Sequence, residues 1–149
     1  MAGTTLEYNY GYRSCCKYHS HSNVNIILSA PHGGVLQPDH VPDRTDNVHS
    51  DENNCQITVT KDICTDEFAE NVADELNKIG HVRPFVIIGR WSRKKVDFNR
   101  EIHEATLNHP EAMSAYESYH RHLKDAINQV NHSFGKGLLI DIHGHGIGK

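Results

Sequence analysis

The sequence has no long apolar run, no strong charge of either sign and few cysteines. None of its apolar runs approaches the ~18 residues that a membrane-spanning helix needs, and the first residues lack the charged and apolar regions of a secretory signal. The formal net charge of −4 gives no reason to expect a nucleic acid or an anionic membrane as a partner. We therefore expect a cytoplasmic protein that binds neither nucleic acid nor membranes.

The cysteines are too few and too irregularly spaced for a disulfide framework or a zinc knuckle. They are Cys15, Cys16, Cys55 and Cys64. Reduced thiols are the simpler interpretation. A nucleotide-binding doubly wound domain is also disfavoured, because no glycine fingerprint follows a strand, and His143 stands where a phosphate loop at the chain's end would need its first glycine.

What the chain does have is an alternation of apolar runs and amphipathic segments. At 37% apolar and 23% charged, it can bury one ordinary core, so we expect a single domain over residues 1–149. Strands are predicted at residues 24–30, 85–89 and 138–141, of which 85–89 is expected to be buried. A lead-in strand is possible within residues 1–22 and a brief strand at 56–60, and residues 36–54 are predicted to form a long loop, a candidate lid. With helices between the three strands, this order predicts an α/β fold with a mostly parallel sheet.

Two helices are predicted from apolar residues that recur at three- and four-residue spacing. The first covers residues 65–79, with Thr65 as its N-cap, and its stripe consists of Phe68, Val72, Leu76 and Ile79. The second covers about residues 110–132, and its stripe consists of Met113, Tyr116, Leu123, Ile127 and Val130.

Two of the predicted strands end in a histidine among glycines. His32 follows Pro31 and precedes two glycines, and His143 stands two residues after Asp141 and before Gly144. The carboxyl ends of parallel strands line the binding crevice of an open sheet, so these imidazoles can converge on a metal ion. Asp141 points to the same side as His143 and can be its hydrogen-bond partner, although it could also cap the following turn. His32 could instead be a turn residue bonded to backbone.

A carboxylate should complete the pair of histidines. Asp66 and Glu67 are the candidates at the start of the first helix, where acidic residues also favour the helix dipole. Asp62 and Asp141 are the next to consider. His145 is open to three interpretations: a third ligand, a proton shuttle or a turn residue.

A basic stretch separates the two histidine turns. Arg93, Asn99 and Arg100 could bind a substrate carboxylate and polarise a scissile carbonyl, with Asp97 holding an arginine in place. The alternative is a solvated basic loop.

Taken in order, SAPHGG at 29–34, TDEFA at 65–69, SRKKVDFNR at 92–100 and DIHGHG at 141–146 resemble the N-formylglutamate amidohydrolase family. That family belongs with the zinc carboxypeptidases and aspartoacylases. The resemblance implies a three-layer α/β sandwich of the zinc carboxypeptidase-like type and one Zn²⁺. The implied zinc ligands are His32, His143 and either Asp66 or Glu67.

The same resemblance implies that Arg93 polarises the substrate carbonyl and that Asn99 and Arg100 hold the substrate's carboxylate. The substrate would be an N-acyl amino acid or a similar small amide. Relatives carry their general base, a glutamate, beyond the second histidine motif, so we expect this domain to be C-terminally incomplete, with His145 or Glu101 as candidate substitutes and an uncovered sheet edge through which copies could associate. The leading hypothesis is a zinc-dependent amidohydrolase, and the alternative is a non-catalytic metal- or ligand-binding form.

Overall fold

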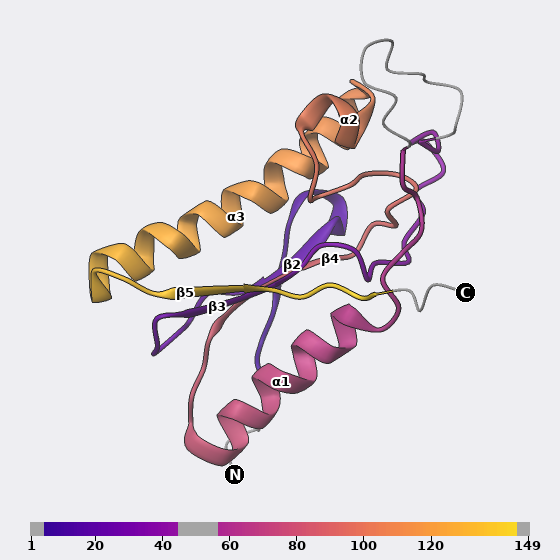
Figure 1. The fold of residues 1–149 in the computed structure, drawn as a ribbon. Coiled ribbons are helices and arrows are strands. Elements are labelled where there is room, and N and C mark those ends of the chain that lie inside the picture. Colours follow the sequence, from indigo (N-terminus) through magenta and orange to yellow (C-terminus); the bar gives the residue numbers. More distant parts are fainter. Residues whose placement is uncertain (1–4, 45–56, 146–149) are drawn as a thin grey trace.

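The computed structural model describes residues 5–44 and 57–145, which form a mixed α/β fold (Figure 1). The strands are β1 (Asn9–Tyr10), β2 (Cys16–His19), β3 (Ile26–Ala30), β4 (Phe85–Gly89) and β5 (Leu138–Asp141). The helices are α1 (Thr65–Gly80), α2 (Ile102–Thr106) and α3 (Pro110–Phe134), and a short 3-10 helix, η1, covers Tyr12–Ser14. The three strands and both long helices predicted from the sequence are therefore confirmed. β1 and β2 lie where only a lead-in strand was considered possible, and α2 was not predicted.

β3 is the centre of the parallel part of the sheet. The strand order is β1-β2-β4-β3-β5, and β3 pairs in parallel with both β4 and β5. β1 and β2 are added antiparallel beyond β4, which makes the sheet mixed. The chain runs from β3 through α1 to β4, and then through α3 to β5 on the other side of β3. Open α/β sheets bind ligands where the connections diverge in this way, at the carboxyl ends of the strands.

Two apolar clusters lie on opposite faces of the sheet, so the described residues form three layers. One cluster joins α3 to the sheet and includes Phe98, Tyr119 and Val130. The other joins α1 to the sheet and includes Leu28, Val86 and Ala73. Figure 1 shows α1 and α3 on the two sides of the strands. An α/β fold is the coarse architecture that the sequence predicted.

The buried face of each long helix matches the predicted apolar stripe only in part. Val130 is buried as predicted, and the stripe residues Val72, Tyr116 and Leu123 are partly buried against the core. In α1, Phe68 and Ile79 are 57% and 81% exposed, whereas Ala69 and Ala73 are fully buried. In α3 the buried residues are again mostly small ones: Ala112, Ala115, Ser118, Tyr119, Ala126 and Val130. Small side chains let a helix backbone approach a sheet that already carries large aliphatic residues, and this close approach decides which face is buried.

Two further local expectations need correction, and a third is not tested. Cys64, not Thr65, is the residue that precedes the first turn of α1, and no side chain caps that turn. Residues 57–60 have no regular structure, and Gln56 lies outside the described residues. Of the loop predicted at 36–54, the structure describes only residues 36–44, so a lid is not tested.

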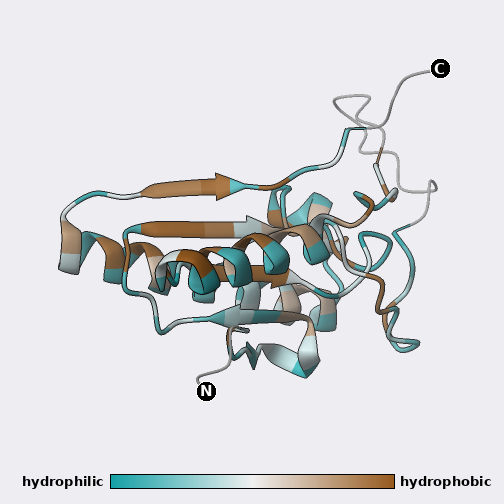
Figure 2. Ribbon diagram, turned by 90° about the horizontal axis from the view of Figure 1, so that it is seen from below, coloured by the Kyte–Doolittle hydropathy of each residue, from teal (hydrophilic) through white to brown (hydrophobic). Residues whose placement is uncertain are grey.

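β5 forms an edge of the sheet. Its aliphatic residues Leu138, Leu139 and Ile140 are 56%, 45% and 41% exposed. Figure 2 shows this hydrophobic strand at the margin of the sheet. An uncovered apolar edge, as expected from the sequence, is a surface on which further chain can pair.

Within residues 5–44 and 57–145, no helix is both long enough and apolar enough to cross a membrane.

Candidate metal centre

The two histidine turns lie side by side at the carboxyl ends of the parallel strands β3 and β5. His32 follows β3 and is 2% exposed, and His143 follows β5 with its side chain 30% exposed. Their ring centroids are 5.2 Å apart. The parallel pairing places Ser29 opposite Asp141, and this register brings both strand ends to the same edge. The convergence predicted from the sequence is therefore observed.

Neighbouring atoms leave no room for a side chain at the two glycines after His32. A Cβ on Gly33 would lie 2.7 Å from the backbone nitrogen and Oδ1 of Asp66, and a Cβ on Gly34 would lie 2.5 Å from the carbonyl group of Arg90. Real Cβ atoms do not approach so closely, so a larger residue would displace this turn.

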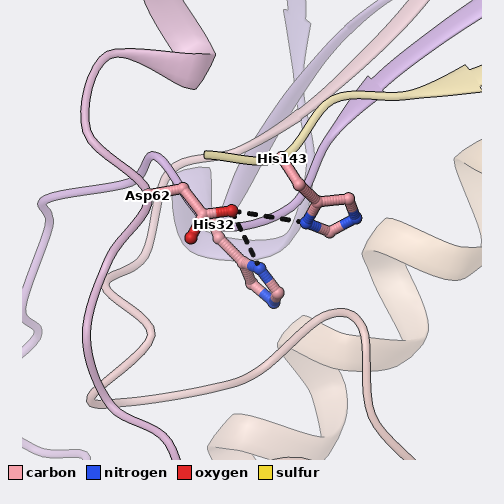
Figure 3. Close-up of side chains that lie close together, drawn as sticks. All are labelled: His32, Asp62 and His143. Carbon is pink, nitrogen blue, oxygen red and sulfur yellow. Dashed lines mark hydrogen bonds and ion pairs between the residues drawn. The ribbon is translucent and has the colours of Figure 1, made fainter. Parts of the chain in front are cut away.

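Asp62 is the carboxylate that meets both histidines (Figure 3). Its Oδ2 lies 3.5 Å from Nδ1 of His32 and 3.3 Å from Nδ1 of His143. The backbone N–H of Asp62 donates to the carbonyl of His32 at 3.0 Å, and Gly144 N–H donates to Asp62 Oδ2 at 3.0 Å. These contacts tie the segment before α1 to both strand ends.

The immediate neighbours of Asp62 favour its ionised form. Burial alone would raise the pKa of this carboxyl, but the Gly144 N–H, the charge of His32 and the hydrogen bond from His143 outweigh burial, so the pKa lies below its ordinary value. A carboxylate and two imidazoles, with one ligand atom each within 4.8 Å of the others, can hold a metal ion.

The far nitrogen of each imidazole contacts a second carboxylate. His32 Nε2 lies 2.6 Å from Asp97 Oδ1, and His143 Nε2 lies 2.7 Å from Asp141 Oδ2. A protonated imidazole donates from both nitrogens, to Asp62 as well as to the second carboxylate. In the neutral form only one nitrogen keeps its proton, and the shorter contact, at Nε2, favours the proton there and the lone pair on Nδ1. Both lone pairs are then on the side of Asp62. The contact between Asp141 and His143 is the partnership predicted from the sequence.

Asp97 is the most enclosed carboxylate of the site, with a side chain that is 0% exposed. Burial raises its pKa, but the hydrogen bond and charge of His32, the hydrogen bond from Arg93 Nε at 2.8 Å and that from the Asn99 backbone at 2.9 Å hold the pKa well below its ordinary value. Asp97 therefore holds Arg93 in place, as predicted, and joins it to His32.

Arg93 and Arg44 both contact Asp97. Arg93 is 8% exposed and also donates from Nη1 to the Thr60 carbonyl at 3.2 Å. Arg44 is 1% exposed, donates to the Arg93 carbonyl at 2.8 Å and lies 3.7 Å from Asp97 Oδ2. Two guanidinium groups thus balance one buried carboxylate. Sequence reasoning missed Arg44, because it lies in a stretch interpreted only as a loop.

The predicted substrate-binding residues Asn99 and Arg100 are exposed, and Asn99 borders His143. Asn99 Nδ2 lies 3.4 Å from His143 Nε2. The Arg100 side chain is 41% exposed and its Nε lies 3.6 Å from Glu104 Oε1. Glu101 accepts hydrogen bonds from the backbone of His103 and Glu104 and so caps α2. Asn99 is therefore adjacent to the candidate metal ligands, whereas Glu101 is occupied at a helix start.

The acidic residues favoured from the sequence are not in the converging group, which among the described residues consists of His32, Asp62 and His143. Asp66 lies beside Gly33 in the first turn of α1, and Glu67 is exposed in the same turn. His145 is exposed and also lies outside the group. The structure thus offers Asp62 in the position for which Asp66 or Glu67 was expected.

No sequence signal distinguished Asp62 from its neighbours, because it lies in an irregular segment and gains its role from the long-range contact with Gly144.

The chain matches no protein-family model, and comparisons with curated proteins and with solved structures give no match.

Proposed function

We propose that His32, Asp62 and His143 bind one zinc ion. Imidazole nitrogens and a carboxylate oxygen are ligands that Zn²⁺ favours, and hydrolytic zinc sites commonly combine three protein ligands with one open position. The observation that carries the proposal is that both histidines bond a carboxylate through Nε2 and turn Nδ1 towards one oxygen of Asp62. Carboxylate partners of this kind are typical of metal-bound histidines.

We further propose that the protein is a zinc-dependent hydrolase of a small N-acyl amino acid or a similar carboxylate-bearing amide. Zinc bound here would supply Lewis acidity for activating water and polarising a carbonyl. Arg93 supports this proposal because Asp97 ties it directly to His32. Its guanidinium would stabilise negative charge that develops on the carbonyl oxygen.

Arg100 and Asn99 would bind the substrate's carboxylate. The contact of Arg100 with Glu104 is long, and both side chains are partly exposed, so a substrate carboxylate can displace it at little cost. Arginine then offers two parallel hydrogen bonds to the incoming group. The amide of Asn99 adds a donor next to His143.

Membership of the N-formylglutamate amidohydrolase family, with its zinc carboxypeptidase-like fold, is part of the proposal. The support is the parallel trio β4-β3-β5, the helices on both faces, and histidines that follow β3 and β5. Four motifs in the family's order agree with it.

The second candidate is a metal-binding domain without catalytic activity. The observation that favours it is the position of Glu101, whose carboxylate caps α2 instead of facing the histidines. His145, the other residue that the sequence offered as a substitute for the general base, is exposed and lies outside the converging group.

Hydrolysis assays on the zinc-loaded protein separate the two candidates. N-formyl, N-acetyl and N-succinyl amino acids with a free carboxylate should be cleaved, and the same compounds with the carboxylate converted to an amide should be cleaved far more slowly, because Arg100 and Asn99 would lose their ligand. Zinc binding without cleavage of any of these compounds would favour the binding domain.

A further inference from the structure

A hydrogen-bonded chain links the metal-facing His143 to the core of the protein. His143 Nε2 lies 2.7 Å from Asp141 Oδ2, and the other oxygen of Asp141 accepts a hydrogen bond from the Ser29 hydroxyl. The Asp141 and His143 side chains are 37% and 30% exposed, whereas Ser29 is 2% exposed. A buried hydroxyl therefore anchors a partly exposed carboxylate and imidazole.

The backbone and the core hold Ser29 in this role. Ser29 and Asp141 are register partners in the parallel pairing of β3 with β5, and the Ser29 carbonyl accepts the N–H of Ile142 at 2.8 Å. On the other side lies Tyr119 of α3, which is 2% exposed. Burial and the charge of Asp141 raise the pKa of the Tyr119 hydroxyl, and a hydrogen bond with Ser29 opposes this rise.

His143 needs such support more than His32 does. The carboxylate behind His32 is fully buried and is held by Arg93 and by backbone. At His143, Asp141 competes with the Asn99 amide, which lies 3.4 Å from the same Nε2. Asp141 also competes with Asp62, which lies 3.3 Å from Nδ1 and would draw the proton to that nitrogen if the 2.7 Å contact with Asp141 were lost. An amide N–H donating to Nε2 requires the lone pair on that nitrogen and the proton on Nδ1, which is the tautomer that cannot bind a metal through Nδ1.

We propose that Ser29 is a positioning residue of the metal centre, which orients Asp141 so that His143 keeps its proton on Nε2 and its lone pair on Nδ1. The part of this inference that concerns affinity rests on the proposed zinc binding. The part that concerns the tautomer applies to the metal-free protein.

The test combines two measurements on Ser29→Ala in the 149-residue chain. In the metal-free protein above pH 8, long-range ¹⁵N–¹H NMR of the histidine rings should show His143, assigned by its loss in His143→Gln, as the Nε2–H tautomer in the wild type and as a mixture in Ser29→Ala. Zinc affinity should fall by at most about 10- to 100-fold, the usual effect of losing a direct partner of a metal ligand, because Ser29 acts on His143 only through Asp141. Ser29→Thr keeps the hydroxyl and should restore both readouts.

Ser118→Ala is the matched control, since Ser118 is a buried serine whose hydrogen-bond partners are the backbone N–H of Tyr12 and the side chains of Cys15 and Cys16, and not Asp141 or a histidine. It should leave the tautomer and zinc affinity unchanged. A folded Ser29→Ala with the wild-type tautomer would overturn the inference, as would equal losses in Ser118→Ala.

If Ser29→Ala fails to fold, Asp141→Asn tests the same series of hydrogen bonds, because it changes the partly exposed carboxylate between Ser29 and His143. It should shift His143 towards the Nδ1–H tautomer, and an unchanged tautomer would contradict the proposal. A wild-type protein that shows the Nε2–H tautomer but takes up no zinc would refute the proposed function and leave the positioning role of Ser29 supported.

Discussion

Asp62→Asn tests the contribution of the Asp62 carboxylate, with its negative charge, to the candidate metal centre. The substitution keeps the size of the side chain, and its amide oxygen can still accept the Gly144 N–H that now donates at 3.0 Å. What is lost is a carboxylate placed 3.5 Å and 3.3 Å from the two imidazole Nδ1 atoms. Two neutral imidazoles would then remain as protein ligands. Loss of even an outer partner costs about 10- to 100-fold in metal affinity, so loss of a direct ligand should cost at least ~1.4–2.7 kcal/mol of binding free energy.

The assay is a competitive zinc titration against a chromophoric chelator, with folding checked by circular dichroism. Asp66→Asn and Glu67→Gln are the matched controls, because both change an acidic residue in the adjacent first turn of α1. They should keep the wild-type affinity. The reasoning is refuted if Asp62→Asn binds zinc as tightly as the wild type while one of the α1 variants loses it.

Three other predictions concern the surroundings of the site. Asp97→Asn should lower stability by about 3–5 kcal/mol at neutral pH, because it leaves buried Arg93 without its carboxylate. The folded-state pKa of Asp97 is depressed, so its stabilising effect is present above the unfolded pKa of about 3.9 and is lost as the pH falls below it; denaturant titrations should show a shallower acid loss in Asp97→Asn than in the wild type. If the protein is a hydrolase, Arg93→Ala should lower kcat by about 100- to 1000-fold, whereas Arg100→Ala should mainly raise KM; steady-state kinetics in which both variants behave like the wild type would contradict these roles. Leu138→Lys on the exposed edge should shift any concentration-dependent association seen by sedimentation towards monomer, and unchanged association would locate the contact elsewhere.

The convergence of His32 and His143 could be predicted from the sequence because it depends on local signals. Each histidine follows a short apolar run and precedes glycines, and parallel strands align their carboxyl ends. The Asp141 contact was predictable for the same reason, since residues two apart on an extended strand share a side.

The role of Asp62 was harder to predict from the sequence, because it depends on contacts between distant segments. Asp62 is tied to His32 and to Gly144, 82 residues away, while an acidic first helical turn offered a more familiar local pattern. The helix faces were predicted only in part, for a related reason. Large apolar residues such as Phe68 and Ile79 suggested the buried stripe, but close packing on the sheet selected the alanines.

Zinc titration of the wild-type chain beside His32→Gln and His143→Gln tests the central claim most directly. The three-residue centre predicts about one tightly bound zinc per wild-type chain and loss of tight binding in both variants, each of which removes one nitrogen ligand from the converging group. Elemental analysis after gel filtration gives the stoichiometry. A folded wild-type chain that takes up no zinc, or tight uptake that survives both substitutions, would contradict the account.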